Sequence, residues 1–200
     1  LIMIDFHKSE NDLIFIPLGG TNEIGMNLNL YQYKGKWIMV DCGTGFADDK
    51  TPGAEIIIPD ITFIKKYKKD LLAIIITHAH EDHIGAIPFL IDELECPIYA
   101  TNFTASFLEA KLGEFDLNQK PKIERMEPGS KITLGPFEID LVPLAHSAPE
   151  MQALYIRTDK GNILHTGDWK FDTDPVLGQK SDEEQLKKLG DEGVLALVCD

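Results

Sequence analysis

The stretch IIITHAHEDHIGAIPFL, residues 74–90, decides the fold class because it joins a buried strand to a dense group of polar ligands. Three of the six histidines of the chain lie in its segment H-A-H-E-D-H. The preceding isoleucines predict a buried strand, and residues two apart in an extended chain point to the same side. We therefore expect His78 and His80 to bind one metal ion, and Asp82 and His83 to face a second position at the start of a helix.

Two later positions follow strand-like segments in the same way. His146 comes just after FEIDLVPL, and Asp168 lies in a Gly-Asp turn after GNILH. Alone, His146 is equally well explained as an ordinary loop residue, and Asp168 is better explained as a turn residue. Beside the histidine cluster both become expected ligands, and the two oxygens of a carboxylate suit Asp168 to bridging two ions.

Composition limits the classes of protein that fit. With 200 residues, 44% hydrophobic and 26% charged, the chain has the make-up of one globular domain, and it contains neither a signal-peptide pattern nor an apolar run of membrane-spanning length. A net charge of −14 argues against a surface that binds nucleic acid everywhere, so a polyanionic substrate would need a local positive centre such as metal ions. Three isolated cysteines favour a reducing cytoplasm over a disulfide framework.

The hydrophobic pattern predicts an α/β fold with sheets and outer helices, and not a doubly wound layout. Strands are expected at residues 13–20, 26–33, 37–41, 70–77, 96–100, 131–135, 137–144, 153–158, 161–168 and 194–200. Helices are expected at residues 82–94, 101–115 and 181–190. In the first of these, Pro88 must lie early in the helix or kink it. Ser181 and Glu184 have capping-box spacing at the start of the last helix, and Gly190 is its expected end.

These motifs together resemble the metallo-β-lactamase superfamily. The resemblance rests on H-A-H-E-D-H, the downstream His146, TGD at 166–168 and VDCG at 40–43. A narrower agreement, in LGGTNEIGMN (18–27), AHSAPE and HTGDWKFD, is similar to the ribonuclease J family of the β-CASP branch and covers nearly the whole chain. Asn22 departs from that family, in which glycine is usual.

The resemblance implies a fold and a domain plan. Residues 1–200 would form the N-terminal portion of a four-layer αβ/βα metallo-β-lactamase sandwich, incomplete at its C-terminus. A β-CASP domain, a further metal-binding histidine and the closing strands would follow residue 200, and homo-oligomers would form through regions outside this chain.

The resemblance also implies roles for single residues. It implies two zinc ions, with manganese as the alternative. The expected metal ligands are His78, His80, Asp82, His83, His146 and Asp168. Asp41 and His165 would support the ligands without binding metal, and Asp82, Asp168 and Asp200 would be the catalytic carboxylates.

The implied function is hydrolysis of single-stranded RNA, as an exonuclease, an endonuclease or both, by a hydroxide that two metal ions activate. One alternative is a small-molecule hydrolase on the same scaffold, such as a glyoxalase II-like thioesterase, a lactonase or a β-lactamase. The other alternative is a catalytically incomplete metal-binding fragment.

Overall fold

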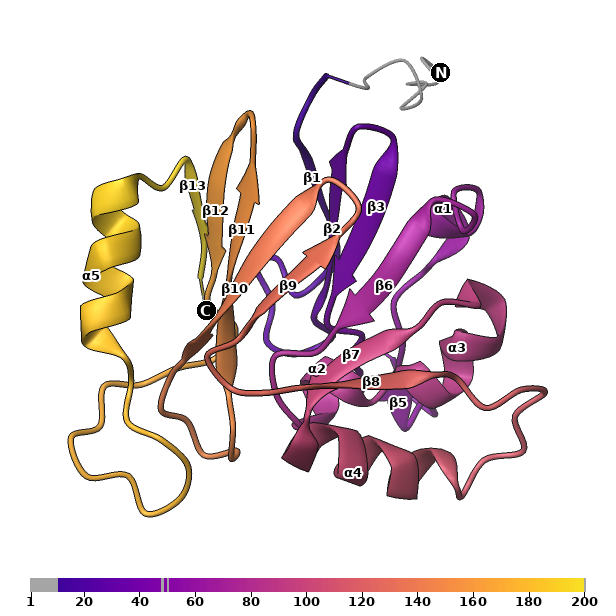
Figure 1. Cartoon of the computed structure of the whole chain (residues 1–200). Coiled ribbons are helices and arrows are strands. Elements are labelled where there is room, and N and C mark those ends of the chain that lie inside the picture. The colour runs from indigo at the N-terminus through magenta and orange to yellow at the C-terminus, as the bar shows by residue number, and fades with distance from the viewer. Residues whose placement is uncertain (1–10, 48, 50, 200) are drawn as a thin grey trace.

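A computed structural model describes residues 11–47, 49 and 51–199, and it places two β-sheets face to face (Figure 1). The first sheet has the strand order β1-β2-β3-β6-β7-β8. Its strands are β1 (Ile14–Gly19), β2 (Leu28–Tyr33), β3 (Lys36–Val40), β6 (Leu71–Ile75), β7 (Ile98–Thr101) and β8 (Ile123–Met126). Strands β1 to β3 are antiparallel, whereas β3, β6, β7 and β8 run parallel. The carboxyl ends of the parallel strands therefore meet at one edge, where polar side chains can gather.

The second sheet has the order β13-β12-β11-β10-β9 and is antiparallel except for the pair β13-β12. Its strands are β9 (Lys131–Leu134), β10 (Phe137–Pro143), β11 (Gln152–Thr158), β12 (Gly161–His165) and β13 (Ala196–Val198). Because β12 and β13 are parallel, the chain must cross over between them, and helix α5 (Glu183–Glu192) lies in that crossover. A separate small ladder joins β4 (Gly45–Phe46) to β5 (Ile56–Ile57).

One hydrophobic core lies between the two sheets. Alternation along β2 directs Tyr31 and Tyr33 into this core, where the first sheet faces Phe137 and Ile139 of the second. The other face of β2 carries Leu28 and its neighbours toward the helices. All six residues of β2 are buried, because both faces of the strand are covered.

Helices cover the outer face of each sheet. Four of them pack on the first sheet through a second apolar cluster: α1 (Thr62–Lys65), α2 (Glu81–Ile84), α3 (Ile87–Leu94) and α4 (Asn102–Leu112). Helix α5 packs on the second sheet through Leu186 and Leu189. The predicted four-layer α/β sandwich is therefore confirmed (Figure 1). None of the helices in the described ranges is long and apolar enough to cross a membrane.

The prediction of one continuous helix at residues 82–94 is wrong. Residues 82–94 form two helices, α2 and α3, separated at Gly85 and Ala86. Pro88 lies in the first turn of α3, where its missing N–H needs no helical partner, so a new helix begins there instead of an old one continuing.

The predicted ends of the last helix are also wrong. The Asp182 carboxylate caps α5 by accepting from the Gln185 N–H at 2.9 Å, whereas the Ser181 hydroxyl accepts from the Ala145 N–H at 2.9 Å. Gly190 lies inside α5, which ends at Glu192 with Gly193 as its C-cap. The short strands β4, β5 and β8 and the one-turn helix α1 were not expected from the hydrophobic pattern, because such short elements show too little periodicity.

Candidate metal centre

Three imidazoles converge at the edge of the two sheets. His78 follows β6, His80 precedes α2, and His146 follows β10. The Nε2 atom of His78 lies 3.0 Å from Nδ1 of His80, and Nε2 of His146 lies 3.2 Å from the same Nδ1. With Asp168, these residues offer four ligand atoms that all lie within 4.8 Å of one another.

The donor set and its spacing fit a zinc-type ion. Two nitrogens that each bind a tetrahedral zinc ion at about 2.0–2.1 Å lie roughly 3.4 Å apart, close to the spacings found here. Burial and the neighbouring His83 lower the pKa of His78 to about 2, so its imidazole is neutral and its lone pair is free to bind a metal. Its Nδ1 lies 3.1 Å from the Thr77 hydroxyl, which orients the ring.

A second group of ligand atoms lies beside the first. Asp82, His83 and Asp168 bring three such atoms within 4.8 Å of one another. Nε2 of His83 lies 3.1 Å from Oδ1 of Asp168 and 3.5 Å from Oδ2 of Asp82. The other oxygen of Asp168, Oδ2, lies 3.8 Å from Nε2 of His146. Asp168 thus directs one oxygen to each group, which is the arrangement that a bridging carboxylate requires.

Asp41 fixes the orientation of His83. It follows β3, is completely buried and has a φ of 61°, a left-handed conformation that aspartate tolerates better than most residues. Its carboxylate lies 2.8 Å from Nδ1 of His83 and accepts from the Thr77 N–H, also at 2.8 Å. Burial opposes the charged form of His83, but Asp41, Asp168 and Asp82 outweigh it and raise the pKa of His83 well above its ordinary value.

The backbone around α2 is held by two loops that contain glycine. The Asn27 N–H donates to the Asp82 carbonyl at 3.0 Å, and the Cys42 N–H donates to the His83 carbonyl at 2.7 Å. A Cβ atom on Gly43 would lie 1.6 Å from the Asp82 carbonyl oxygen, so only glycine allows this close approach. The loops thereby fix the positions of both ligands of α2.

The structure brings all six sequence-predicted ligands into the two groups. His165, which was predicted to support the ligands, lies outside both groups. It is the last residue of β12 and is buried. Its Nδ1 atom lies 2.7 Å from the hydroxyl of Tyr31. Asp200, the third predicted catalytic carboxylate, lies outside the described residues. Sequence reasoning missed Asn27, whose Nδ2 lies 3.2 Å from Nε2 of His83, although its place in the glycine-containing segment 18–27 was a signal.

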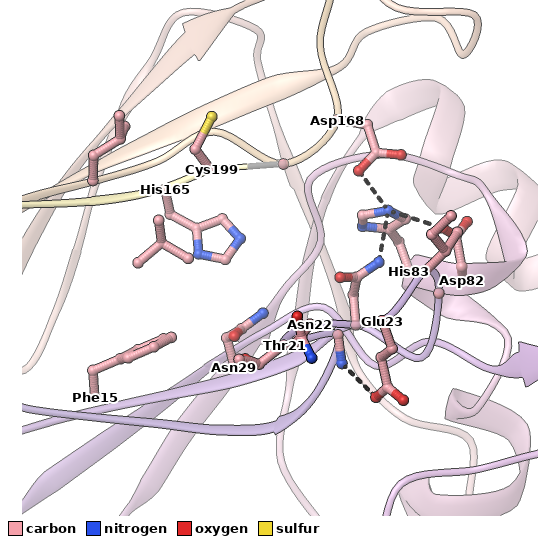
Figure 2. Close-up of a pocket in the computed structure, with 17 residues that line it drawn as sticks. Phe15, Thr21, Asn22, Glu23, Asn29, Asp82, His83, His165, Asp168 and Cys199 are labelled. Carbon is pink, nitrogen blue, oxygen red and sulfur yellow. Dashed lines mark hydrogen bonds and ion pairs between the residues drawn. The ribbon is translucent and has the colours of Figure 1, made fainter.

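A cavity of about 390 Å³ opens beside the second group (Figure 2). Asp82, His83 and Asp168 line one end of it. Its other walls come from the loop at 20–25 and from the ends of β2, β12 and β13. The candidate metal centre is therefore open to a ligand from this side.

Comparisons with known proteins identify the superfamily of the chain. The family described as "Beta-lactamase superfamily domain" matches residues 36–185. Among curated relatives, Ribonuclease J of Sinorhizobium meliloti is 48% identical over 195 residues, which is 96% of this chain and 35% of the relative. Ribonuclease J of Corynebacterium glutamicum is 39% identical over 95% of this chain and 26% of the relative. The chain thus spans about a third or less of the length of these relatives.

Two solved structures share the fold. A protein of unknown function from Enterococcus faecalis has a TM-score of 0.62 and 22% identity, over 80% of this chain and 44% of that one. The metallo-β-lactamase fold protein YhfI of Bacillus subtilis has a TM-score of 0.55 and 19% identity, over 81% of this chain and 65% of that one. At these identities the likeness shows the fold alone.

Proposed function

Because the chain belongs to the β-lactamase superfamily and has the metallo-β-lactamase fold, we propose that it is the metal-binding part of a ribonuclease that hydrolyses the phosphodiester bonds of RNA. The observation that carries this proposal is the bridging arrangement of Asp168 between two groups of ligand atoms. The similarity to Ribonuclease J, which extends over nearly the whole chain, supports RNA as the substrate over a thioester or lactone.

Charge supports the same proposal. The chain carries a net charge of −14, and several carboxylates lie at the site itself, so an RNA phosphate would be repelled from the bare protein. Two divalent cations, most simply zinc with manganese as the alternative, would reverse that charge locally and lower the pKa of a bound water toward neutrality. The six ligands would thus convert a repulsive surface into one that holds the scissile phosphate.

The protein's own residues would hold the cations, orient the imidazoles and move a proton. His78, His80 and His146 would hold one cation and Asp82 and His83 the other, while Asp168 would fix the spacing between them. Asp41 and Thr77 would orient the imidazoles of His83 and His78, so that no ligand has to turn as the substrate arrives. Asp200 would move a proton to the leaving oxygen.

A domain plan follows as part of the proposal. We infer that the longer protein continues into a β-CASP domain that forms the rest of the RNA channel, and that oligomers form through those later regions. Cys42, Cys96 and Cys199 form no disulfide with one another, which supports a reducing cytoplasm as the location, where RNA decay takes place.

The test uses this chain and a version extended to the full open reading frame. Each protein is loaded with zinc or manganese and offered a single-stranded RNA, and a thioester and a lactone in parallel. We expect metal-dependent cleavage of RNA by the extended protein, and loss of cleavage in Asp168→Asn. Thioester or lactone turnover without RNA cleavage would contradict the proposal.

A further inference from the structure

The first ligand group combines residues of the two sheets, so its geometry depends on how the sheets are joined at this edge. His78 and His80 follow the end of β6 in the first sheet, whereas His146 lies in the turn between β10 and β11 of the second. The apolar contacts between the sheets are non-directional. A hydrogen bond has a preferred length and angle, so it fixes the relative position of the two segments that it joins more closely.

Gln152, the first residue of β11, makes such a bond through its backbone. The register of β11 and β12 would place Gly167 opposite Gln152, but β12 ends two residues earlier. The Gln152 N–H instead donates to the Thr77 carbonyl at 3.1 Å. Among the residues that the structure describes, no other backbone–backbone hydrogen bond joins the two sheets at the ligand edge. Because Thr77 directly precedes His78, this bond ties β11 to the segment that carries the first ligand.

The side-chain amide of Gln152 holds the turn that carries His146. Its Nε2 donates to the Glu150 carbonyl at 3.1 Å and to the Met151 carbonyl at 2.8 Å. Its Oε1 accepts from the Gly129 N–H at 3.1 Å. The residue is completely buried, so water does not compete for these bonds. The amide therefore joins the turn between β10 and β11 to the turn between β8 and β9.

The turn that carries His146 also contains a residue with an unusual backbone conformation. Glu150 has a φ of 57°, in the left-handed region that glutamate seldom adopts. Such a conformation persists only where the surrounding contacts fix it. Two contacts do so here: the Gln152 amide donates to the Glu150 carbonyl, and the Glu150 carboxylate accepts from the Phe103 N–H of α4 at 2.8 Å. The turn is thus held from both sides, and His146 with it.

We infer that Gln152 is a positioning residue for the first ligand group, which consists of His78, His80 and His146. Its backbone N–H anchors β11 to the segment before His78, and its side-chain amide fixes the turn of His146. One buried residue thereby sets the spacing between ligands that come from different sheets. The inference rests on the proposed function, because it requires that this group binds a metal ion. It assigns part of the affinity for that ion to a residue outside both ligand groups.

The test compares zinc affinities in the protein extended to its full open reading frame. Gln152→Met keeps an unbranched side chain of similar length and removes the amide. We expect it to weaken zinc binding by the first group about 10-fold, the lower end of the range for residues that support metal ligands, in competition with a chelating dye. Gln152→Glu keeps the acceptor for the Gly129 N–H but can donate to at most one carbonyl, so it should also weaken this binding.

Selectivity for one ligand group separates positioning from general destabilisation. In a His80→Ala background we expect only the second group to bind zinc, and adding Gln152→Met there should change that affinity by less than about 2-fold. With cobalt(II) in place of zinc, the visible absorption reports the geometry of the ligands around the ion. The absorption of the first group should therefore change in Gln152→Met.

Gln32→Met is the matched control. Gln32 is also buried, at 1% exposed, and it lies near the end of β2 away from the ligands. Its amide faces the Asp12 carbonyl and the Gly35 N–H, each at 3.2 Å. The substitution should lower the melting temperature, because it leaves buried backbone groups without partners. It should change neither of the two zinc affinities nor the cobalt absorption.

The outcomes distinguish the inference from the proposed function. If the parent protein binds no zinc in the first group, the proposed metal centre fails and the inference is overturned with it. If the parent binds two zinc ions, and Gln152→Met retains the affinity of the first group or lowers both affinities equally, only the positioning role is overturned. If Gln152→Met does not fold, the same comparison with Gln152→Glu decides the question.

Discussion

Asp41→Asn is the substitution that most directly tests how the ligands are held. Asparagine has nearly the same shape and tolerates the φ of 61° found here, so the change removes charge without adding backbone strain. Alanine would be a poorer choice, because it would combine loss of hydrogen bonds with strain and an empty space. The asparagine amide would also bring its own N–H groups toward the donors of Thr77 and His83.

The size of the effect follows from the contacts that change. The carboxylate has three partners within 2.9 Å: the Thr77 N–H at 2.8 Å, Nδ1 of His83 at 2.8 Å and the Thr77 hydroxyl at 2.9 Å. A hydrogen bond to a charged group contributes about 1.5–3 kcal/mol, and asparagine keeps one of the two acceptor oxygens. We expect the free energy of unfolding of the metal-free protein to fall by about 2–3 kcal/mol, which lowers the melting temperature by about 4–12 °C in a chain of this size.

Metal affinity should fall as well, because the group that orients His83 is weakened. Loss of such a supporting group costs about 10- to 100-fold in metal affinity. Zinc binding would be followed by competition with a chelating dye, and stability by urea unfolding. The control is Asp159→Asn, because the side chain of Asp159 is 76% exposed. This substitution should change neither the zinc affinity nor the stability to urea. If Asp41→Asn binds two zinc ions as tightly as the parent and unfolds at the same urea concentration, the orienting role of Asp41 is refuted.

Three further predictions concern other parts of the molecule. His80→Ala should reduce the metal content from two ions per chain to one, measured by mass spectrometry of the elements, and retention of both ions would contradict its assignment as a ligand. Gly43→Ala should lower the melting temperature by several degrees and weaken metal binding, because its Cβ would displace the Asp82 carbonyl; an unchanged melting temperature would show that the loops can separate freely. Burial is the largest single influence on the pKa of Asp140 and would raise it, but the hydrogen bonds and charges of Arg157 and Lys131 together outweigh burial and lower this pKa. Asp140 therefore stabilises the fold above the unfolded-state pKa of about 4, and this contribution is lost as pH falls through the lower folded-state value. Urea unfolding from pH 5 to pH 2 should therefore show less loss of stability in Asp140→Asn than in the parent, and equal losses would argue against this role.

The sequence predicted the layers of the fold because long apolar runs have a clear period. Strands such as β6 and β10 were recognised from their buried residues, and the expected ligands His78 and His146 follow the ends of these strands, as the hydrophobic pattern predicted. The same information could not give the break between α2 and α3, since the apolar spacing of residues 82–94 continues across it. Pro88 was a signal for that break, but a proline in the first turn of a helix and one that kinks a helix look alike in sequence.

Side-chain contacts between distant segments were the least predictable feature. Helix α5 is capped by Asp182 because Ser181, the residue with capping-box spacing, is engaged by the Ala145 backbone 36 positions away. The pairing of His165 with Tyr31 joins residues 134 positions apart. Sequence patterns report local periodicity, and these contacts depend on which strands of the two sheets lie opposite each other.

The most direct measurement is an anomalous-difference map from crystals grown with zinc, collected on both sides of the zinc absorption edge. The account predicts two peaks: one bound by His78, His80 and His146, the other by Asp82 and His83, with one oxygen of Asp168 at each. A single peak, or peaks at other residues while these side chains remain without metal, would contradict the paired-cation centre on which the proposed nuclease chemistry depends.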